Sequence, residues 1–121
     1  MTRTKRRIIE YCDWFALTWS AIIGYLSLSP LSALPEIAAS DKLEHFAAYA
    51  VLGFLGVILR RSKRDTFWVL FAIVVYGGLI ETIQPYVNRF MELGDFIANT
   101  CGALFGASLV LISSRVNTWR E

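Results

Sequence analysis

The sequence predicts an all-α integral membrane protein, a four-helix bundle with both termini in the cytoplasm, on three observations. The chain of 121 residues is 55% hydrophobic and only 18% charged, which is more apolar than soluble domains of this size, because those carry a charged shell. The apolar residues gather in four long runs, each close to the roughly 20 residues of a spanning helix. The charges lie mostly between the runs, as is typical of helical membrane proteins.

The four predicted helices follow one another along the chain. Their apolar runs cover residues 14–31, 43–59, 66–80 and 96–113. The third extends to Gln84, where Pro85 ends it, because proline lacks the N–H that a helix interior requires. The alternating ten-residue segments of a membrane β-barrel are absent from the sequence.

Basic residues predict the orientation. Ten of the twelve Lys and Arg fall before the first run, between the second and third, or after the fourth. Four spans place these three segments on one side, and the positive-inside rule makes that side cytoplasmic. We therefore expect a multi-pass membrane protein with both termini in the cytoplasm. Its predicted parts are a basic cytoplasmic arm at 1–13, a transmembrane domain at 14–113 and a cytoplasmic tail at 114–121.

The alternative for the first run is a cleaved signal peptide, since basic residues precede it. Its apolar stretch is longer than the ~7–15 residues usual in such peptides. A retained first span is therefore favoured.

Polar side chains gather near the outer ends of the other three predicted helices. The candidate substrate-binding or functional residues are Asp41, Lys42, His45, Tyr49, Glu81, Gln84, Arg89, Asp95 and Asn99. Asp41, His45 and Tyr49 are spaced by four, so they share one helical face. Ionisable groups just below the membrane surface are costly unless they face the bundle interior and have partners. One cavity open to the outer surface is therefore expected to be lined by Asp41, His45, Glu81, Arg89, Asp95 and Asn99.

Other roles stay open for some of these residues. Asp41 and Glu44 match a capping box, and Asp95 follows a glycine as an N-cap residue does. His45 and Asn99 also suit simple hydrogen bonds between helices. Glu81 is expected to be ionised and hydrogen-bonded to Arg89 or Lys42, or to share a proton with His45.

Small residues predict close packing of helices. Gly102 and Gly106 form a G-x-x-x-G pair, which lets a neighbouring helix approach closely. Gly53 on the second predicted helix is assigned to the same packing role.

Two segments, DKLEHFAAYAVLGFL and GGLIETIQPYVNRFMELGDFIANTCGALFG, resemble the VanZ-like family of small bacterial membrane proteins. The family pattern is D-K-x-x-H-F-x-x-Y-x-x-L-G, then E-x-x-Q, then R-x-x-x-x-x-D-x-x-x-N-x-x-G-x-x-x-G, and the chain matches every position between residues 40 and 106. The resemblance implies a multi-pass protein of the bacterial cytoplasmic (inner) membrane, within the cell envelope. The family is linked to resistance against the glycopeptide teicoplanin, which acts on cell-wall precursors outside the membrane.

Three functions follow as hypotheses. The first is binding or transport of a lipid-linked envelope precursor or a phospholipid, in which Lys42 and Arg89 meet an anionic headgroup. The second is an enzyme acting on a lipid phosphate or ester, with Glu81 and His45 as base and acid. The third is a structural scaffold.

The enzyme hypothesis ranks below lipid binding because the sequence has no nucleophile motif and no dense metal-ligand spacing. A divalent ion on Asp41, His45, Glu81 and Asp95 is compatible with it. The sequence alone leads us to expect no cofactor, no metal and no nucleic-acid partner; a homo-oligomer is left open.

Overall fold

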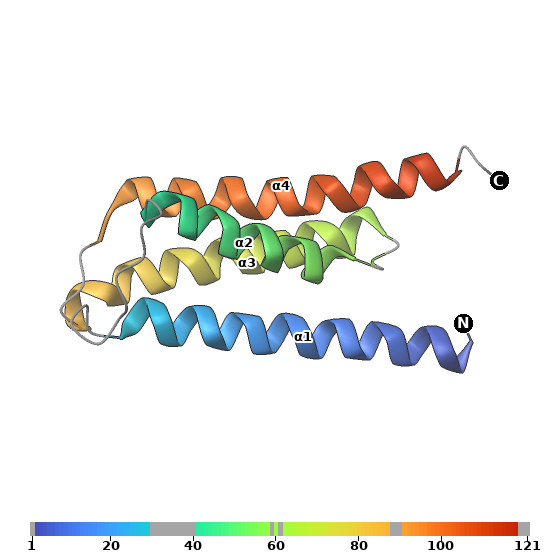
Figure 1. The fold of residues 1–121 in the computed structure, drawn as a ribbon, viewed down its shortest axis with the longest axis horizontal. Helices are drawn as coiled ribbons and strands as arrows, with labels where there is room; N and C mark the ends of the chain where they lie inside the picture. The colour runs from blue at the N-terminus through green and yellow to red at the C-terminus, as the bar shows by residue number, and fades with distance from the viewer. Residues whose placement is uncertain (1, 30–40, 59, 61, 88–90, 119–121) are drawn as a thin grey trace.

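The computed structural model describes residues 2–29, 41–58, 60, 62–87 and 91–118. In this part the chain forms helices and turns, with no strand, so the predicted all-α class is confirmed. The elements are α1 (Arg3–Leu28), α2 (Asp41–Val57), α3 (Lys63–Ile83), the short 3-10 helix η2 (Gln84–Val87) and α4 (Leu93–Thr118). Successive α-helices run in opposite directions (Figure 1).

Local sequence explains the boundaries of α3. Ser62 is its N-cap, and the Ser62 hydroxyl accepts a hydrogen bond from the backbone N–H of Asp65 at 3.0 Å. Asp65 also places a negative charge in the first turn, where the helix dipole favours it. The α-helix ends at Ile83 because Pro85 cannot continue it, and the chain tightens into η2.

The other helices begin earlier or end later than their apolar runs. The basic arm is part of α1, which starts at Arg3, and α4 continues through the first residues of the predicted tail. Because α4 begins at Leu93, Asp95 lies within its first turn rather than at an N-cap. The side chain of Asp41, the first residue of α2, is outside the described part, so its capping role stays a prediction.

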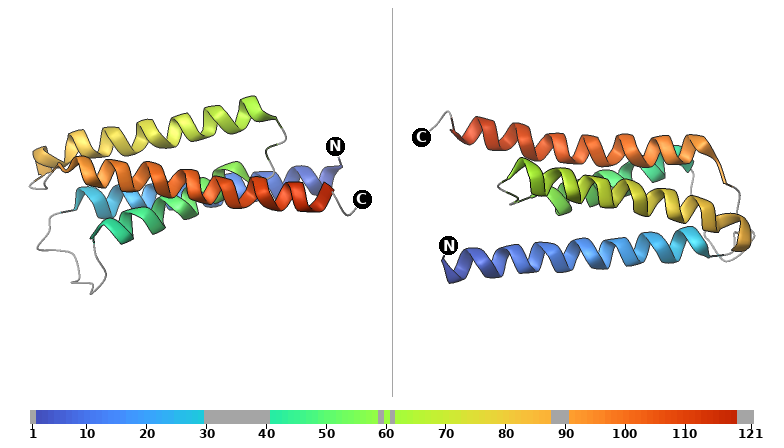
Figure 2. Two further views of the ribbon diagram at one scale, coloured as in Figure 1. Left: turned by 90° about the horizontal axis from the view of Figure 1, so that it is seen from above. Right: turned by 180° about the vertical axis from the view of Figure 1, so that it is seen from behind.

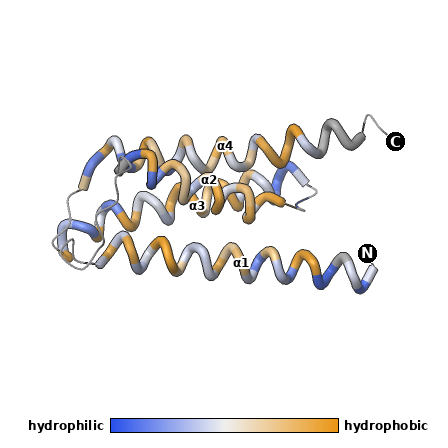
Figure 3. Tube along the Cα trace, in the orientation of Figure 1, coloured by the Kyte–Doolittle hydropathy of each residue, from blue (hydrophilic) through white to orange (hydrophobic). Residues whose placement is uncertain are grey.

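The alternating directions give the bundle two different ends (Figures 1 and 2). The start of α1, the end of α2, the start of α3 and the end of α4 share one end. The basic residues of the described helices at that end are Arg3, Lys5, Arg6, Arg7, Lys63, Arg64 and Arg115. The start of α2, η2 and the start of α4 share the other end, and hydrophilic segments mark both ends of a mostly apolar bundle (Figure 3).

The closest packing joins α2 and α4. A Cβ atom added at Gly53, Gly102 or Gly106 would overlap a backbone carbonyl of the facing helix. Ala103 and Ala107 on α4 are buried on the same crossing, at 0% and 2% exposure. Because these residues are so small, the two backbones touch directly.

Polar side chains fasten α1 to the other helices. Trp19 donates its indole N–H to the backbone carbonyl of Ala48 in α2 at 2.9 Å. The hydroxyl of Tyr76 and the side-chain amide of Gln84 donate to backbone carbonyls of α1, the latter at 3.2 Å. These contacts make α1 part of the bundle.

Large apolar side chains lie on the outside of the bundle. On α3, Phe67, Phe71, Val75 and Leu79 are spaced by four and form a stripe whose members are 41–60% exposed. Glu81, by contrast, is buried at 3% exposure. A soluble domain buries its large apolar residues and exposes its carboxylates, so this distribution suits a lipid environment.

Two helices of the described part are long and apolar enough to cross a membrane: Lys63–Val87 and Leu93–Ser113. Only 22% and 33% of their most apolar stretches are buried, which distinguishes them from the core helices of a soluble protein. The 17 residues of α2 sit at the lower limit for a span. In α1, polar residues such as Thr18 and Ser20 lower the mean hydropathy of the apolar run.

Candidate functional site

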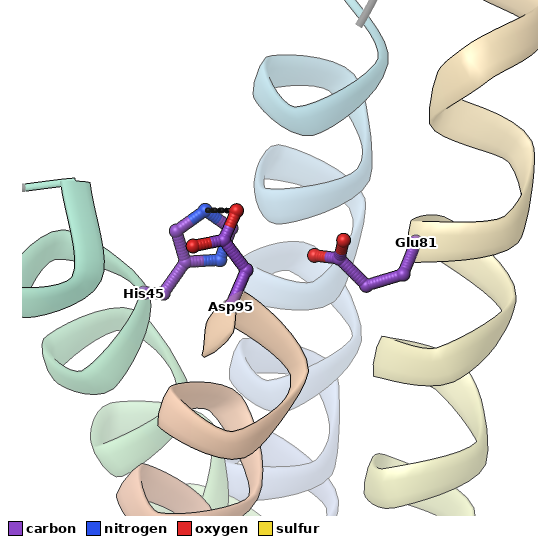
Figure 4. A group of neighbouring side chains, drawn as sticks. All are labelled: His45, Glu81 and Asp95. Carbon is purple, nitrogen blue, oxygen red and sulfur yellow. Dashed lines mark ion pairs between the residues drawn. The ribbon is translucent and has the colours of Figure 1, made fainter. Parts of the chain in front are cut away.

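Three helices each contribute an ionisable side chain at the end of the bundle opposite the basic residues. His45 comes from the second turn of α2, Glu81 from the last turn of α3 and Asp95 from the first turn of α4 (Figure 4). One nitrogen or oxygen atom from each lies within 4.8 Å of the other two. Glu81 and Asp95 are 3% and 4% exposed, so neither carboxylate can rely on bulk water for stabilisation.

His45 is oriented by α4. Its Nδ1 lies 2.8 Å from Oδ1 of Asn99, and its Nε2 lies 3.8 Å from Oδ2 of Asp95. A carbonyl oxygen only accepts hydrogen bonds, so in this arrangement Nδ1 carries a proton and donates it. The spacing of four residues between Asp95 and Asn99 allows both to reach the same imidazole.

Lys42 covers the exposed side of the cluster, just before the apolar run of α2 begins. Its Nζ lies 3.0 Å from Oε2 of Glu92 and 3.5 Å from Oδ1 of Asp95, and the Lys42 side chain is 56% exposed. The hydrogen bond and charge of Glu92 raise the pKa of Lys42 above its ordinary 10.5. The ammonium group therefore stays charged at neutral pH.

Glu92 is the residue that the sequence interpretation missed. Its side chain holds Lys42, and its backbone N–H donates to Oε2 of Glu81 at 3.4 Å. In the sequence Glu92 is one of several charged residues between the third and fourth apolar runs. The one feature that could have indicated a role in the site is its position three residues before Asp95. Glu92 links all three helices because it directly precedes α4, its side chain binds Lys42 of α2, and its backbone N–H reaches Glu81 near the end of α3.

Tyr49 and Gln84 lie next to the cluster. Tyr49 is 2% exposed, packs its ring against Gly77 and interacts electrostatically with Glu81. Its hydroxyl has no hydrogen-bond partner among the described residues. Gln84 is 1% exposed and directs its amide nitrogen to α1.

The structure thus brings together most of the predicted site residues. Lys42, His45, Glu81, Asp95 and Asn99 contact one another directly or through a shared neighbour. The side chain of Asp41 and the whole of Arg89 lie outside the described residues. A pairing of Glu81 with Arg89, and a cavity open to the outer surface, stay predictions. Among the described residues, Lys42 forms ion pairs with Glu92 and with Asp95.

This set of groups has two chemical capacities. The imidazole and two buried carboxylates can exchange protons or coordinate a cation. The ammonium of Lys42, at the exposed side, can donate to an anion.

The sequence of the chain matches a known protein family. A family model described as VanZ/LLP1 matches residues 2–114. No curated protein and no solved structure matches the chain. The family match includes the arm and α1 as well as the segments whose motifs carry the resemblance. A small all-helical chain with apolar outer faces and a polar cluster at one end, matched over nearly its whole length, belongs to the VanZ/LLP1 family.

Proposed function

We propose that this protein spans the bacterial cytoplasmic membrane four times and binds the phosphate headgroup of a lipid at the extracytoplasmic face. The lipid is a lipid-linked envelope precursor or a phospholipid. The observation that carries the proposal is the exposed Lys42 ammonium, held by Glu92 and Asp95 at the edge of a buried polar cluster.

The topology is supported by the two ends of the bundle. Basic residues of α1 and α3 share the end where α4 finishes, and the polar cluster lies at the other. The positive-inside rule places the basic end in the cytoplasm. The docking of α1 through Trp19 and Tyr76 supports its retention as a span, since these contacts would be lost with a cleaved peptide.

A reporter that is active only in the cytoplasm should therefore work when fused after Glu121 and fail when inserted in the connection between α1 and α2. A reporter active only outside should give the opposite pattern. Both fusions can be measured in growing cells, with expression of each fusion checked by immunoblot. A C-terminus outside the cytoplasm would contradict the topology.

A lipid phosphate fits the exposed edge of the cluster. The ammonium of Lys42 has three N–H donors; it donates to Glu92 at 3.0 Å, and Asp95 forms a longer ion pair with it at 3.5 Å. Because the Lys42 side chain is 56% exposed, its ammonium is also accessible to a group outside the protein. A phosphate oxygen at headgroup depth would form a charge-assisted hydrogen bond with the ammonium.

The ligand is tested in nanodiscs of phosphatidylcholine containing small amounts of phosphatidylglycerol or undecaprenyl phosphate. Native mass spectrometry of the wild-type protein should show one of these lipids retained above its bulk fraction. Retention of the phosphomonoester favours an envelope precursor, and retention of the diester favours a phospholipid. Lys42→Met should reduce retention several-fold because it removes the donor.

The matched control is Lys63→Met, which removes a lysine at the opposite end of the bundle and should leave retention unchanged. Equal retention by wild type and Lys42→Met, or no enrichment by the wild type, would remove the support for this ligand.

A further inference from the structure

We infer that His45, Glu81 and Asp95 form a binding site for one divalent metal ion. This site is distinct from the lipid-binding edge, because it occupies the buried interior of the cluster and needs no lipid. Each of three helices supplies one ligand, and the three candidate donor atoms lie within 4.8 Å of one another.

The separations suit a metal ion at the centre of the cluster. Nitrogen and oxygen ligands lie about 2.0–2.2 Å from Zn²⁺, so neighbouring ligands are roughly 3–3.5 Å apart. Nε2 of His45 and Oδ2 of Asp95 are already 3.8 Å apart. A distance of 3.8 Å is too long for a direct hydrogen bond. Small side-chain rotations would close the cluster to the ligand spacing, with no change in the helices.

The tautomer of His45 favours the same interpretation. Histidines that bind metals usually donate the other ring N–H to an oxygen acceptor, which fixes the ring and its tautomer. Here Nδ1 is engaged by Oδ1 of Asn99 at 2.8 Å. Nε2, the other nitrogen, faces Asp95. Asn99 is therefore a positioning residue for the ligand nitrogen.

Tyr49 gives an independent observation. Its side chain is 2% exposed, it lies one helical turn below His45 on α2, and it interacts electrostatically with Glu81. Its hydroxyl has no hydrogen-bond partner in the described part of the chain. Buried hydroxyls nearly always have a partner. A water molecule bound to the metal would supply one.

The closeness of two carboxylates favours binding of a cation at this position. Glu81 and Asp95 place two carboxylates within 4.8 Å of one another in a poorly hydrated interior, where like charges repel strongly. Lys42 meets Asp95 from the exposed side. One imidazole and two carboxylates suit Mn²⁺ or Zn²⁺, since Mg²⁺ and Ca²⁺ prefer all-oxygen sites.

The test measures metal binding directly on the full chain in detergent, without added lipid and with a histidine-free affinity tag. After treatment with EDTA and dialysis, Mn²⁺ binding is followed by electron paramagnetic resonance and Zn²⁺ binding by calorimetry. We expect one equivalent of metal per chain. Glu81→Gln and Asp95→Asn should each weaken binding at least tenfold. Asn99→Ala should weaken binding about 10–100-fold, the range for residues that orient a metal ligand.

The control variant is Glu10→Gln, which changes a carboxylate on α1 outside the cluster and should leave binding unchanged. A second measurement uses the wild-type protein alone, so it does not depend on whether any variant folds. His45 is the single histidine of the chain, so its imidazole nitrogen signals can be followed by NMR. Saturating Zn²⁺ should shift the Nε2 signal.

Two results would overturn the inference: no stoichiometric metal binding with unchanged His45 signals, or full binding by folded Glu81→Gln and Asp95→Asn proteins. The lipid measurement repeated in EDTA separates the two proposals. Lipid retention without metal binding would remove only the metal site, and metal binding without lipid retention would remove only the proposed ligand.

Discussion

Gly106→Leu should lower the free energy of unfolding by about 3–5 kcal/mol, the largest loss that we expect from a single substitution in the bundle. A Cβ added at Gly106 overlaps the backbone carbonyl of Ala50 and approaches the backbone nitrogen of Phe54. Backbone atoms inside a helix cannot rotate away as a side chain can, so α2 and α4 must separate. Separation would also remove the contacts of Ala103 and Ala107. Thermal unfolding in detergent measures the loss.

Gly78→Ala is the matched control. Gly78 is also a helical glycine, but its added Cβ would meet only the ring of Phe96, at 3.3 Å. The ring can shift, and alanine improves helix propensity by about 1 kcal/mol. We expect this variant to stay within about 1 kcal/mol of the wild type. Similar melting temperatures for Gly106→Leu and Gly78→Ala would show that the α2–α4 crossing is not a close backbone contact.

Asp95→Ala should have the second-largest effect, a loss of about 2–4 kcal/mol. Asp95 is 4% exposed and joins α4 to two cationic or polar groups of α2, Lys42 at 3.5 Å and His45 at 3.8 Å. Its removal takes one partner from the partly buried imidazole and leaves a cavity at the start of α4. Removing one partner of a fully buried ion pair would cost more stability. The loss for Asp95→Ala is smaller because its partner Lys42 is exposed to solvent, which weakens their attraction. Unfolding is measured in EDTA, so that any bound metal does not contribute.

Asp95→Asn keeps the shape and removes only the charge, so its melting temperature should lie between those of Asp95→Ala and the wild type. Glu10→Ala is the surface control. Glu10 lies 3.8 Å from Arg6 with both side chains more than half exposed, and such pairs contribute little. A loss as large for Glu10→Ala as for Asp95→Ala would mean that burial of the carboxylate is not the cause.

The sequence predicts the helices of this protein well because apolar runs and Pro85 mark them directly. The all-α class, the end of α3 just before Pro85 and the family follow from such local patterns, although α3 ends at Ile83, one residue earlier than predicted. The convergence of His45, Glu81, Asp95 and Asn99 was also expected, because polar residues near the ends of apolar helices must face one another.

Contacts made by connections and by aromatic donors were not predicted. Glu92 belongs to a short connection, and no periodic pattern says which way such a segment folds. Trp19 and Tyr76 look like ordinary membrane-helix aromatics in the sequence. Their roles depend on which backbone carbonyl lies opposite, and that is a property of the packed helices.

The fastening of α1 has a consequence for how the sequence of this helix can vary. Tyr76 and Gln84 donate to the backbone carbonyls of Ser20 and Ser27, and every amino acid supplies such a carbonyl. The receiving positions therefore impose no side-chain identity, whereas the donating positions do. Substitutions at Ser20 and Ser27 can therefore keep these two hydrogen bonds, whereas Ile23 and Gly24 between them pack against the bundle and are constrained by their size.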